Sequence, residues 1–405
     1  MRAIHFSAFL LILAACRPTP TVTELPNPAG PGARFPYLHA SGSAVLMSWM
    51  EEVRPGFFHI KTASFDGQSW SEPESVDSSD AYFVNWADFP SVVGADGNPI
   101  AAHWLQKVAG GTYAYHIKTA FRNADGGWGP AFSPHTDGTP TEHGFVSLMP
   151  LSADRVLAVW LDGRHTGGGG HEGHDSHDGH HGMMTLRSAE LSPDGRLSNE
   201  SEIDDSVCDC CQTGIAPVPG GAVAAYRDRT HNEIRDISLA RYDTDSGLWT
   251  PIGSLHDDGW EITGCPVNGP RIASNGDHVV ATWFTMAEGM PVVAAKRSTD
   301  GGRTFGQRVV IDETSNSGRV DVVVDADGTA WISWLGTKGG DPALALRSWS
   351  AAGRLGQVFH PAMADMSRRS GFPRMARLGD TLILAYTDPE NGYRVRTVTF
   401  RYRID

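Results

Sequence analysis

The sequence has 405 residues, of which 40% are hydrophobic and 20% charged, which argues against wholesale disorder and allows a sizeable core. Its 46 Gly and 25 Pro argue against a mainly helical protein. The 33 basic and 47 acidic residues give a formal net charge of −14, and such a shortage of Lys and Arg disfavours a nucleic-acid partner.

The first fifteen residues, 1–15, have the pattern of a signal peptide. Their apolar stretch begins soon after Arg2 and is too short to span a bilayer. The stretch ends in Leu13-Ala14-Ala15-Cys16, which resembles the bacterial lipobox, and that resemblance implies a lipid on Cys16. In the alternative, the leader is an ordinary secretory signal and Cys16 is incidental. Residues 16–33 are rich in Pro and predict an extended tether. We therefore expect a lipid-anchored protein of the bacterial cell envelope, periplasmic or at the cell surface.

Short β-type runs that end in an aromatic residue recur along the rest of the chain. Successive aromatics are about 55 residues apart, and the longest step, 66 residues, separates Trp160 from Tyr226. This period exceeds the ~40 to 45 residues of WD-type blades but suits a four-stranded propeller blade with roomy loops. The seven runs are 44–49, 99–104, 156–160, 222–226, 278–283, 329–334 and 381–386.

A turn motif follows the third expected strand of several units. Residues 298–305 read STDGGRTF and match S-x-D-x-G-x-T-[WF] at every fixed position, while residues 64–70 are one residue short of it. In such a turn the Asp carboxylate accepts backbone N–H bonds and Gly supplies the positive φ. With its repeats, the chain over residues 34–405 resembles bacterial sialidase-like, Asp-box (BNR) β-propeller lipoproteins. Weaker versions of the motif occur at 125–128, 192–195 and 245–249.

The resemblance and the repeat together predict an all-β, sialidase-like β-propeller over residues 34–405. Seven repeat units predict about seven four-stranded blades, with part of the tether adding a strand to the final unit; six blades, the usual sialidase number, is the alternative. Strands in a blade alternate in direction. The loop that enters the first strand and the loop between the second and third strands therefore share one face, and the Asp-box turns lie on the other.

An insertion at about 165–182 accounts for the longest step of the repeat. Its imidazoles are interleaved with Gly and acidic residues, a composition that can wrap a divalent transition metal such as Zn, Cu or Ni. The alternative is a solvated low-complexity insert. The candidate metal ligands are His165, His171, His174, His177, His180 and His181.

Four cysteines fall at matching points of adjacent units. Cys208, Cys210 and Cys211 enter the fourth unit and Cys265 enters the fifth, so Cys265 is expected to approach the other three. Outside the cytoplasm, four thiols most simply form two disulfides, with three pairings open. A thiolate metal site is the alternative, because three Cys within four residues also resemble soft-metal ligation.

The loop 227–236 and the segment before Cys265 contribute charged and aromatic groups to the same face. Carboxylates, guanidinium groups and an indole together are the groups expected at a binding site for a polar, sugar-like ligand. The alternative is a solvated loop without a ligand. Arg227, Arg229, Arg235 and Trp260 are the candidate ligand-binding residues. The candidate catalytic carboxylates are Asp228, Glu233, Asp258 and Glu261.

The resemblance to sialidases implies three arginines that grip a substrate carboxylate, an acid/base Asp and a Tyr nucleophile activated by a Glu. Arg34-Phe35-Pro36 is similar in place to the motif of the first arginine, although Phe35 stands where that motif has isoleucine. No Tyr and Glu can be paired from the sequence. Paired donors in one plane suit guanidinium groups to carboxylates. The candidates for the other arginines are Arg271, Arg319 and Arg374.

Three functions follow from these observations. The first is a carbohydrate-active or carbohydrate-binding propeller, a sialidase-like glycoside hydrolase if it is an enzyme, with a glycan or small polar ligand. The second is a transition-metal binding envelope protein that uses the His-rich insertion and the cysteines. The third is a protein-interaction scaffold. We expect a monomer that contacts the membrane through its N-terminal lipid only.

Overall fold

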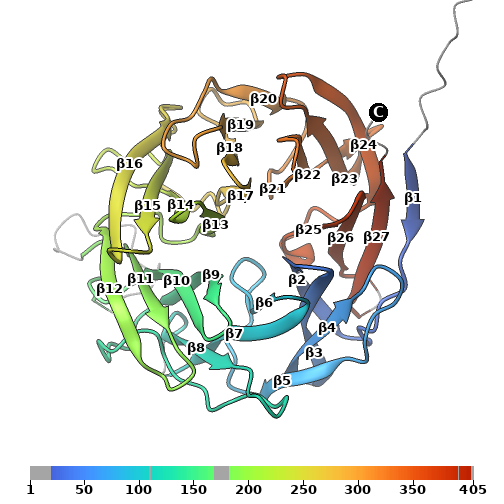
Figure 1. Ribbon diagram of the computed structural model, residues 1–405. Coiled ribbons are helices and arrows are strands. Elements are labelled where there is room, and N and C mark those ends of the chain that lie inside the picture. Colours follow the sequence, from blue (N-terminus) through green and yellow to red (C-terminus); the bar gives the residue numbers. More distant parts are fainter. Residues whose placement is uncertain (1–19, 109–110, 168–181, 391, 403–405) are drawn as a thin grey trace, which may run out of the picture.

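The computed structural model describes residues 20–108, 111–167, 182–390 and 392–402. These residues form antiparallel strands and one 3-10 helix, η1 (Arg368–Ser370). Seven sheets stand as blades around a central axis (Figure 1), which confirms the β-propeller and its seven blades over the alternative of six. None of the described residues forms a helix with the length and apolar character to cross a membrane. Cys16, the expected site of lipid attachment, and residues 17–19 of the tether lie outside the described residues.

The first three blades follow the chain from its N-terminal side. Blade 1 contains β2 (Ala33–Ser41), β3 (Ala44–Arg54), β4 (Phe57–Phe65) and β5 (Glu74–Ser79). Blade 2 contains β6 (Ser91–Ala95), β7 (Asn98–Lys107) and β8 (Tyr115–Phe121), and its outer strand is reduced to a bridge between Thr119 and Phe132. Blade 3 contains β9 (His143–Ser152), β10 (Arg155–Asp162), β11 (Thr185–Leu191) and β12 (Leu197–Asp204).

The remaining blades repeat the pattern. Blade 4 contains β13 (Gly214–Val218), β14 (Gly221–Arg227), β15 (Ile237–Asp243) and β16 (Leu248–His256). Blade 5 contains β17 (Arg271–Asn275), β18 (His278–Thr285), β19 (Val292–Ser298) and β20 (Val309–Asp312). Blade 6 contains β21 (Asp321–Val324), β22 (Ala330–Lys338), β23 (Asp341–Trp349) and β24 (Leu355–Met363). Blade 7 contains β25 (Arg374–Leu378), β26 (Thr381–Asp388), β27 (Arg394–Arg401) and β1 (Thr21–Glu24).

The ring is closed by a strand from the other end of the chain. β1 pairs antiparallel with β27, with Thr21 opposite Arg401 and Glu24 opposite Val398 (Figure 1). Side-chain bonds extend this closure, because Asn27 Nδ2 donates to the Val395 carbonyl at 3.1 Å. The predicted strand from the tether is therefore present, and it covers the edge of the last blade.

The repeated aromatic residues all lie on the second strand of their blade, as the repeat predicts. The largest fully buried side chains include Trp49, Trp160, Trp283 and Trp334, one in each of four blades. They fill apolar clusters that hold adjacent blades together. Each such side chain contributes on the order of 1.5–3 kcal/mol of transfer free energy when it is buried.

The Asp-containing turns lie on the face opposite the insertion. Asp300 Oδ1 accepts from the N–H groups of Arg303 and Thr304 at 3.0 Å, the staple that the turn motif predicts. The Gly301 N–H donates to the Asp277 carbonyl in the turn between β17 and β18. The hairpin at Asp300 therefore lies on the same face of the ring as that turn. The loops that enter the first strands of blades 3, 4 and 5 (β9, β13 and β17) lie on the opposite face of the ring from this hairpin. These loops contain the candidate site.

Candidate functional site

The three clustered cysteines lie in the segment between β12 and β13. Val207 forms an isolated bridge with Asp228, and the Cys208 N–H donates to the Arg227 carbonyl at 2.9 Å. The Val207 N–H also donates to the Met184 carbonyl at 2.9 Å, just before β11. The segment is therefore fixed between the loop that follows β14 and the described end of the blade 3 insertion.

The sulfur atoms of this segment converge. Cys208 Sγ lies 3.1 Å from Cys211 Sγ and 3.9 Å from Cys210 Sγ, and all three sulfurs lie within 4.8 Å of one another. The three side chains are 0%, 2% and 8% exposed for Cys208, Cys211 and Cys210. A disulfide would require about 2.05 Å, and the four cysteines that the structure describes are free thiols. The described residues thus present convergent thiols where disulfides were the first expectation.

Cys265 lies in the segment that enters β17. Its side chain is exposed, and its thiol is among the neighbours that raise the pKa of Cys210, after burial and the thiols of Cys208 and Cys211. Burial first, and then neighbouring charges that include Cys265, raise the pKa of Tyr113 and of Glu142. The approach of Cys265 to the other cysteines, which the blade repeat predicts, stays a prediction.

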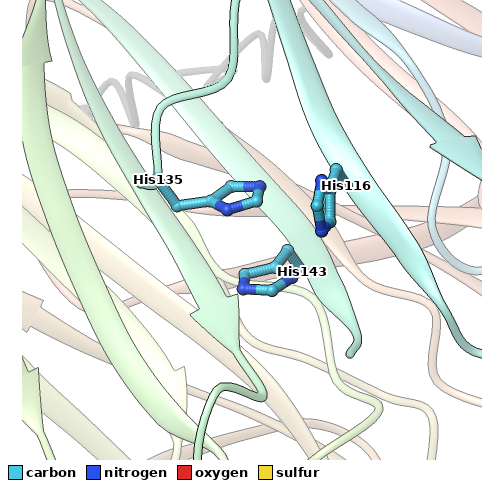
Figure 2. A group of neighbouring side chains, drawn as sticks. All are labelled: His116, His135 and His143. Atoms are coloured by element: carbon cyan, nitrogen blue, oxygen red, sulfur yellow. The ribbon is translucent and has the colours of Figure 1, made fainter. Parts of the chain in front are cut away.

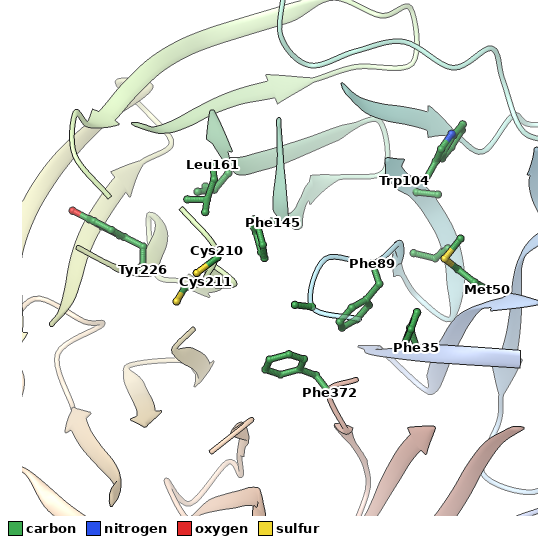
Figure 3. Close-up of a cluster of buried hydrophobic side chains, with 14 of the residues drawn as sticks. Phe35, Met50, Phe89, Trp104, Phe145, Leu161, Cys210, Cys211, Tyr226 and Phe372 are labelled. Carbon is green, nitrogen blue, oxygen red and sulfur yellow. The ribbon is translucent and has the colours of Figure 1, made fainter. Parts of the chain in front are cut away.

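An apolar shell surrounds the buried sulfurs. Figure 3 shows Cys210 and Cys211 in the same cluster as Leu161, Phe145 and Tyr226, and the cluster continues to aromatic rings near the axis. An apolar surround limits water access to a metal site and lowers the local dielectric, which strengthens charge interactions there.

The electrostatics of the cluster differ from one cysteine to the next. Burial opposes ionisation of Cys208, but hydrogen bonds from the Cys210 and Cys211 thiols and the charge of Arg235 hold its pKa well below the usual range. Burial raises the pKa of Cys210 and of Cys211 above the usual range. Cys208 is therefore the sulfur of this cluster that ionises most readily.

A chain of alternating charges leads to Cys208 and orients its sulfur. Arg235 is 1% exposed, and its Nη1 donates to Cys208 Sγ at 3.5 Å. Glu233 has a left-handed φ of 57°, and its carboxylate accepts from Arg235 Nη2 at 2.8 Å and from Arg229 Nη2 at 2.6 Å. Arg229 Nη1 in turn lies 3.0 Å from Asp209 Oδ2. The structure therefore places three predicted site residues, Arg229, Glu233 and Arg235, around the sulfurs as supporting groups.

Arg227 and Trp260 tie the loops of blades 4 and 5 together. Arg227 Nη2 donates to the Asn268 carbonyl at 2.7 Å and to the Phe284 carbonyl at 2.8 Å. Its guanidinium carbon lies 4.9 Å from the centre of the Trp260 ring, which is 7% exposed. Both predicted ligand-binding residues are buried in contacts within the protein.

The other predicted catalytic carboxylates have separate partners. Asp228 accepts from Ser238 Oγ at 3.2 Å, and Asp258 accepts from Trp283 Nε1 at 2.6 Å. Burial raises the pKa of both carboxyl groups. Glu261 is exposed, and its backbone bridges Ile234. The structure does not bring these three carboxylates together at one hydrogen-bonded centre within its described residues.

Two of the arginines that the sialidase resemblance assigns to binding a substrate carboxylate, Arg34 and Arg319, have partners within the protein. Arg34 Nη2 lies 2.6 Å from Glu52 Oε2, and its guanidinium carbon lies 3.9 Å from the centre of the Tyr393 ring. Arg319 Nη1 donates to the Gly371 carbonyl at 2.8 Å. Internal partners therefore occupy both guanidinium groups.

Arg271 and Arg374 line a small cavity between the first strands of the blades. The cavity has a volume of about 20 Å³, room for roughly one water molecule. Arg271 Nε lies 3.1 Å from Asp321 Oδ1. Arg374 is 3% exposed, and its Nε and Nη1 have no hydrogen-bond partner within the described part of the chain. A cavity of this size cannot take a sugar.

The predicted histidine ligands of the insertion lie mostly outside the described residues. His171, His174, His177, His180 and His181 belong to residues 168–181, which the structure does not describe. His165 is described and exposed. The insertion leaves β10 after Asp162 and returns before β11, and the Gly163 N–H donates to the Glu142 carbonyl at 2.8 Å. Its described ends therefore lie on the face that carries the cysteines.

A cluster of histidines that the sequence reasoning missed lies beside these ends. His116 in β8, His135 in the connection to blade 3 and His143 at the start of β9 point toward one another (Figure 2). No sequence pattern pointed to these residues, because they come from three segments with no common spacing.

Comparisons with solved structures find propellers at low sequence identity. A phage phi92 endosialidase has a TM-score of 0.48 at 10% identity, over 95% of this chain and 69% of that one. A neuraminidase-like protein from a bat isolate from Guatemala has a TM-score of 0.46 at 10% identity, over 95% of this chain and 92% of the other. A puromycin hydrolase has a TM-score of 0.50 at 14% identity, over 91% of this chain and 52% of that one.

These likenesses concern the fold alone. Sialidase-like and neuraminidase-like proteins are among these structural neighbours, and the sheets of the chain themselves form a β-propeller. No protein-family model matches the chain, and no curated protein matches it in sequence. Function must therefore be argued from the side chains of the site.

Proposed function

We propose that the protein is a lipid-anchored envelope propeller that binds a thiophilic transition metal ion, Cu(I) or Zn(II), through Cys208, Cys210, Cys211 and Cys265. The observation that carries the proposal is the convergence of three buried sulfurs within 4.8 Å of one another. Soft thiolate ligands select such ions over the hard cations that oxygen ligands hold.

The surroundings of the sulfurs support this proposal. Arg235 donates to the Cys208 sulfur and is itself held by Glu233, so this ligand is oriented before a metal arrives. Cys265 is exposed and so is accessible to an ion from solvent. The proposal also includes the candidate ligands of the blade 3 insertion that lie outside the described residues, His171, His174, His177, His180 and His181.

The test is metal binding by the full-length, untagged protein under reducing conditions. We expect about one equivalent of metal to be retained against a competing chelator, with bathocuproine disulfonate for the Cu(I) arm and a Zn(II) chelator for the other. Cys210→Ser should weaken retention at least about tenfold, because it removes a central ligand. Asp205→Asn changes an exposed residue of the same segment and leaves every sulfur and the charges around Cys208 in place, so it should retain the metal.

Two results would contradict the proposal. One is equal metal retention by the wild type and by Cys210→Ser. The other is recovery of the four cysteines as two disulfides in protein isolated from its compartment, mapped by mass spectrometry without reduction. In that case the cysteines staple the loops of blades 4 and 5 to each other.

The envelope anchor is part of the same proposal. It rests on the lipobox-like sequence that ends in Cys16 and on the position of β1, which begins the folded ring at Thr21. We expect the wild type in the membrane fraction and Cys16→Ser in the soluble fraction. An unchanged membrane fraction for Cys16→Ser would remove the lipid anchor.

A carbohydrate ligand is the second candidate, and the sialidase-like fold favours it. The internal pairing of Arg34, Arg271 and Arg319 weighs against hydrolysis of sialosides, because a carboxylate grip needs guanidinium donors that face a substrate. We expect no turnover of a fluorogenic sialoside. Turnover that is lost in Arg374→Lys would restore the glycoside hydrolase proposal.

A further inference from the structure

The histidine cluster between blades 2 and 3 has the form of a second metal site. One ligand nitrogen from each of His116, His135 and His143 lies within 4.8 Å of the other two (Figure 2). The rings of His135 and His143 stack at 3.8 Å between centroids, and His116 stands perpendicular to both. His135 is 5% exposed and His143 is fully buried, so surface crowding does not account for the cluster.

Backbone carbonyls fix the tautomer of two of the rings. His116 Nε2 lies 2.8 Å from the Thr139 carbonyl oxygen, and His143 Nδ1 lies 3.1 Å from the Thr141 carbonyl oxygen. A carbonyl oxygen only accepts, so each of these nitrogens carries the hydrogen. The opposite nitrogens, Nδ1 of His116 and Nε2 of His143, therefore present lone pairs. Metal-ligating histidines are oriented by the same type of contact.

His135 supplies the third lone pair. Its Nδ1 lies 3.2 Å from Asp137 Oδ1, to which it donates. Its Nε2 is buried and has no partner among the residues described. An unpaired buried polar atom costs about 1–3 kcal/mol, a cost that a bound ion would remove.

Asp137 holds two of the rings in place. Its Oδ1 accepts from His135 Nδ1 and lies 3.2 Å from His143 Nε2. Its Oδ2 accepts from the Thr139 N–H at 3.0 Å. The carboxylate is therefore engaged beside the cluster, in the role that acidic partners have next to metal-ligating histidines.

We propose that His116, His135 and His143 form a binding site for a divalent transition metal ion, Zn(II) in the first place. Three imidazoles with a water molecule in the fourth position are a ligand set that Zn(II) takes in proteins. The site has nitrogen ligands and no sulfur, so it is chemically distinct from the cysteine cluster. A bound ion would connect blade 2 to blade 3, because His116 lies in β8 and His143 in β9.

Cobalt(II) absorption of the full-length chain separates this site from the other two. The chain should carry His171, His174, His177, His180 and His181 replaced by Asn, which removes competing imidazoles, and Cys210→Ser, which disables the thiol cluster. We expect one equivalent of Co(II) with visible d–d bands and without thiolate charge-transfer absorption. Excess Zn(II) should displace it.

Matched variants decide which residues hold the ion. His135→Ala in that background should weaken Co(II) binding at least about tenfold, whereas His231→Ala, an exposed histidine of blade 4, should leave it unchanged. His135→Gln keeps the polar volume and guards against a folding defect, and Zn(II) should raise the Tm of the parent but not of this variant. Equal Co(II) affinity in the parent and both His135 variants would overturn the site, whatever the fate of the cysteine proposal.

Discussion

Asp88 is a buried carboxyl group whose environment makes stability depend on pH. It is 3% exposed and accepts from the Phe145 N–H at 2.9 Å and from Tyr115 Oη at 3.2 Å. Burial outweighs these bonds and raises its pKa to about 7. Gly144 leaves room for the Asp88 carboxyl group, because a Cβ at position 144 would lie 2.0 Å from Asp88 Oδ2. Glu142, which accepts from the same Tyr115 hydroxyl at 2.7 Å, has its pKa raised in the same direction.

The pKa of Asp88 gives a prediction with a definite sign. Between the unfolded value near 4 and the folded value of about 7, the folded state holds a proton that the unfolded state releases. The free energy of unfolding therefore decreases as the pH rises through this window, by up to about 4 kcal/mol for this group. Asp88→Asn should remove that part of the decrease, as measured by urea unfolding at several pH values.

The matched control for this variant is Asp96→Asn. Asp96 is exposed and has a left-handed φ of 50°, which Asn tolerates. We expect the control to keep the pH dependence of the wild type. If Asp88→Asn and Asp96→Asn give the same slope, a group other than Asp88 sets the pH dependence.

At the scale of single elements, turns and strands were predictable because their signals are local. A Gly and an Asp at fixed spacing determine a hairpin, and a buried aromatic marks the second strand of each blade. The partners of the arginines were not predictable. Arg271 pairs with Asp321, 50 positions away, and Arg34 pairs with Glu52 across a hairpin. Such choices depend on which side chains meet across blades, which spacing alone does not encode.

The hairpin at Asp300 gives a prediction on this scale. Its carboxylate accepts from Ser298 Oγ, Thr304 Oγ1 and the N–H groups of Arg303 and Thr304. Asp300→Ala should lower the free energy of unfolding by about 1–3 kcal/mol, because several bonds are lost at once. Asp125 accepts only from the Gly127 N–H among the described bonds, so Asp125→Ala should cost less than about 1 kcal/mol.

Metal binding is the second readout of these hairpin variants. The hairpin lies on the face opposite the cysteines, so both variants should bind the same amount of metal as the wild type. Loss of metal from a folded Asp300→Ala protein would contradict the assignment of the two faces.

On the scale of the whole molecule, the ring gathers two ligand clusters onto one face. The histidine cluster includes His143 at the start of β9, and the three clustered cysteines lie between β12 and β13, so a nitrogen site and a sulfur site occupy loops of the same face. The sequence allowed the cysteines to be placed together through the blade repeat. It did not reveal the histidines, because they come from three segments with no common spacing.

The ligands of the bound metal can be identified directly by X-ray absorption at the metal edge. The measurement uses the full-length protein with the five histidines at 171, 174, 177, 180 and 181 replaced by Asn, and with His135→Ala to vacate the second site. Loaded with one equivalent of Zn(II), this protein should show sulfur scatterers at about 2.3 Å. A first shell of nitrogen and oxygen only, at about 2.0–2.1 Å, would contradict the thiolate site on which the proposed function depends.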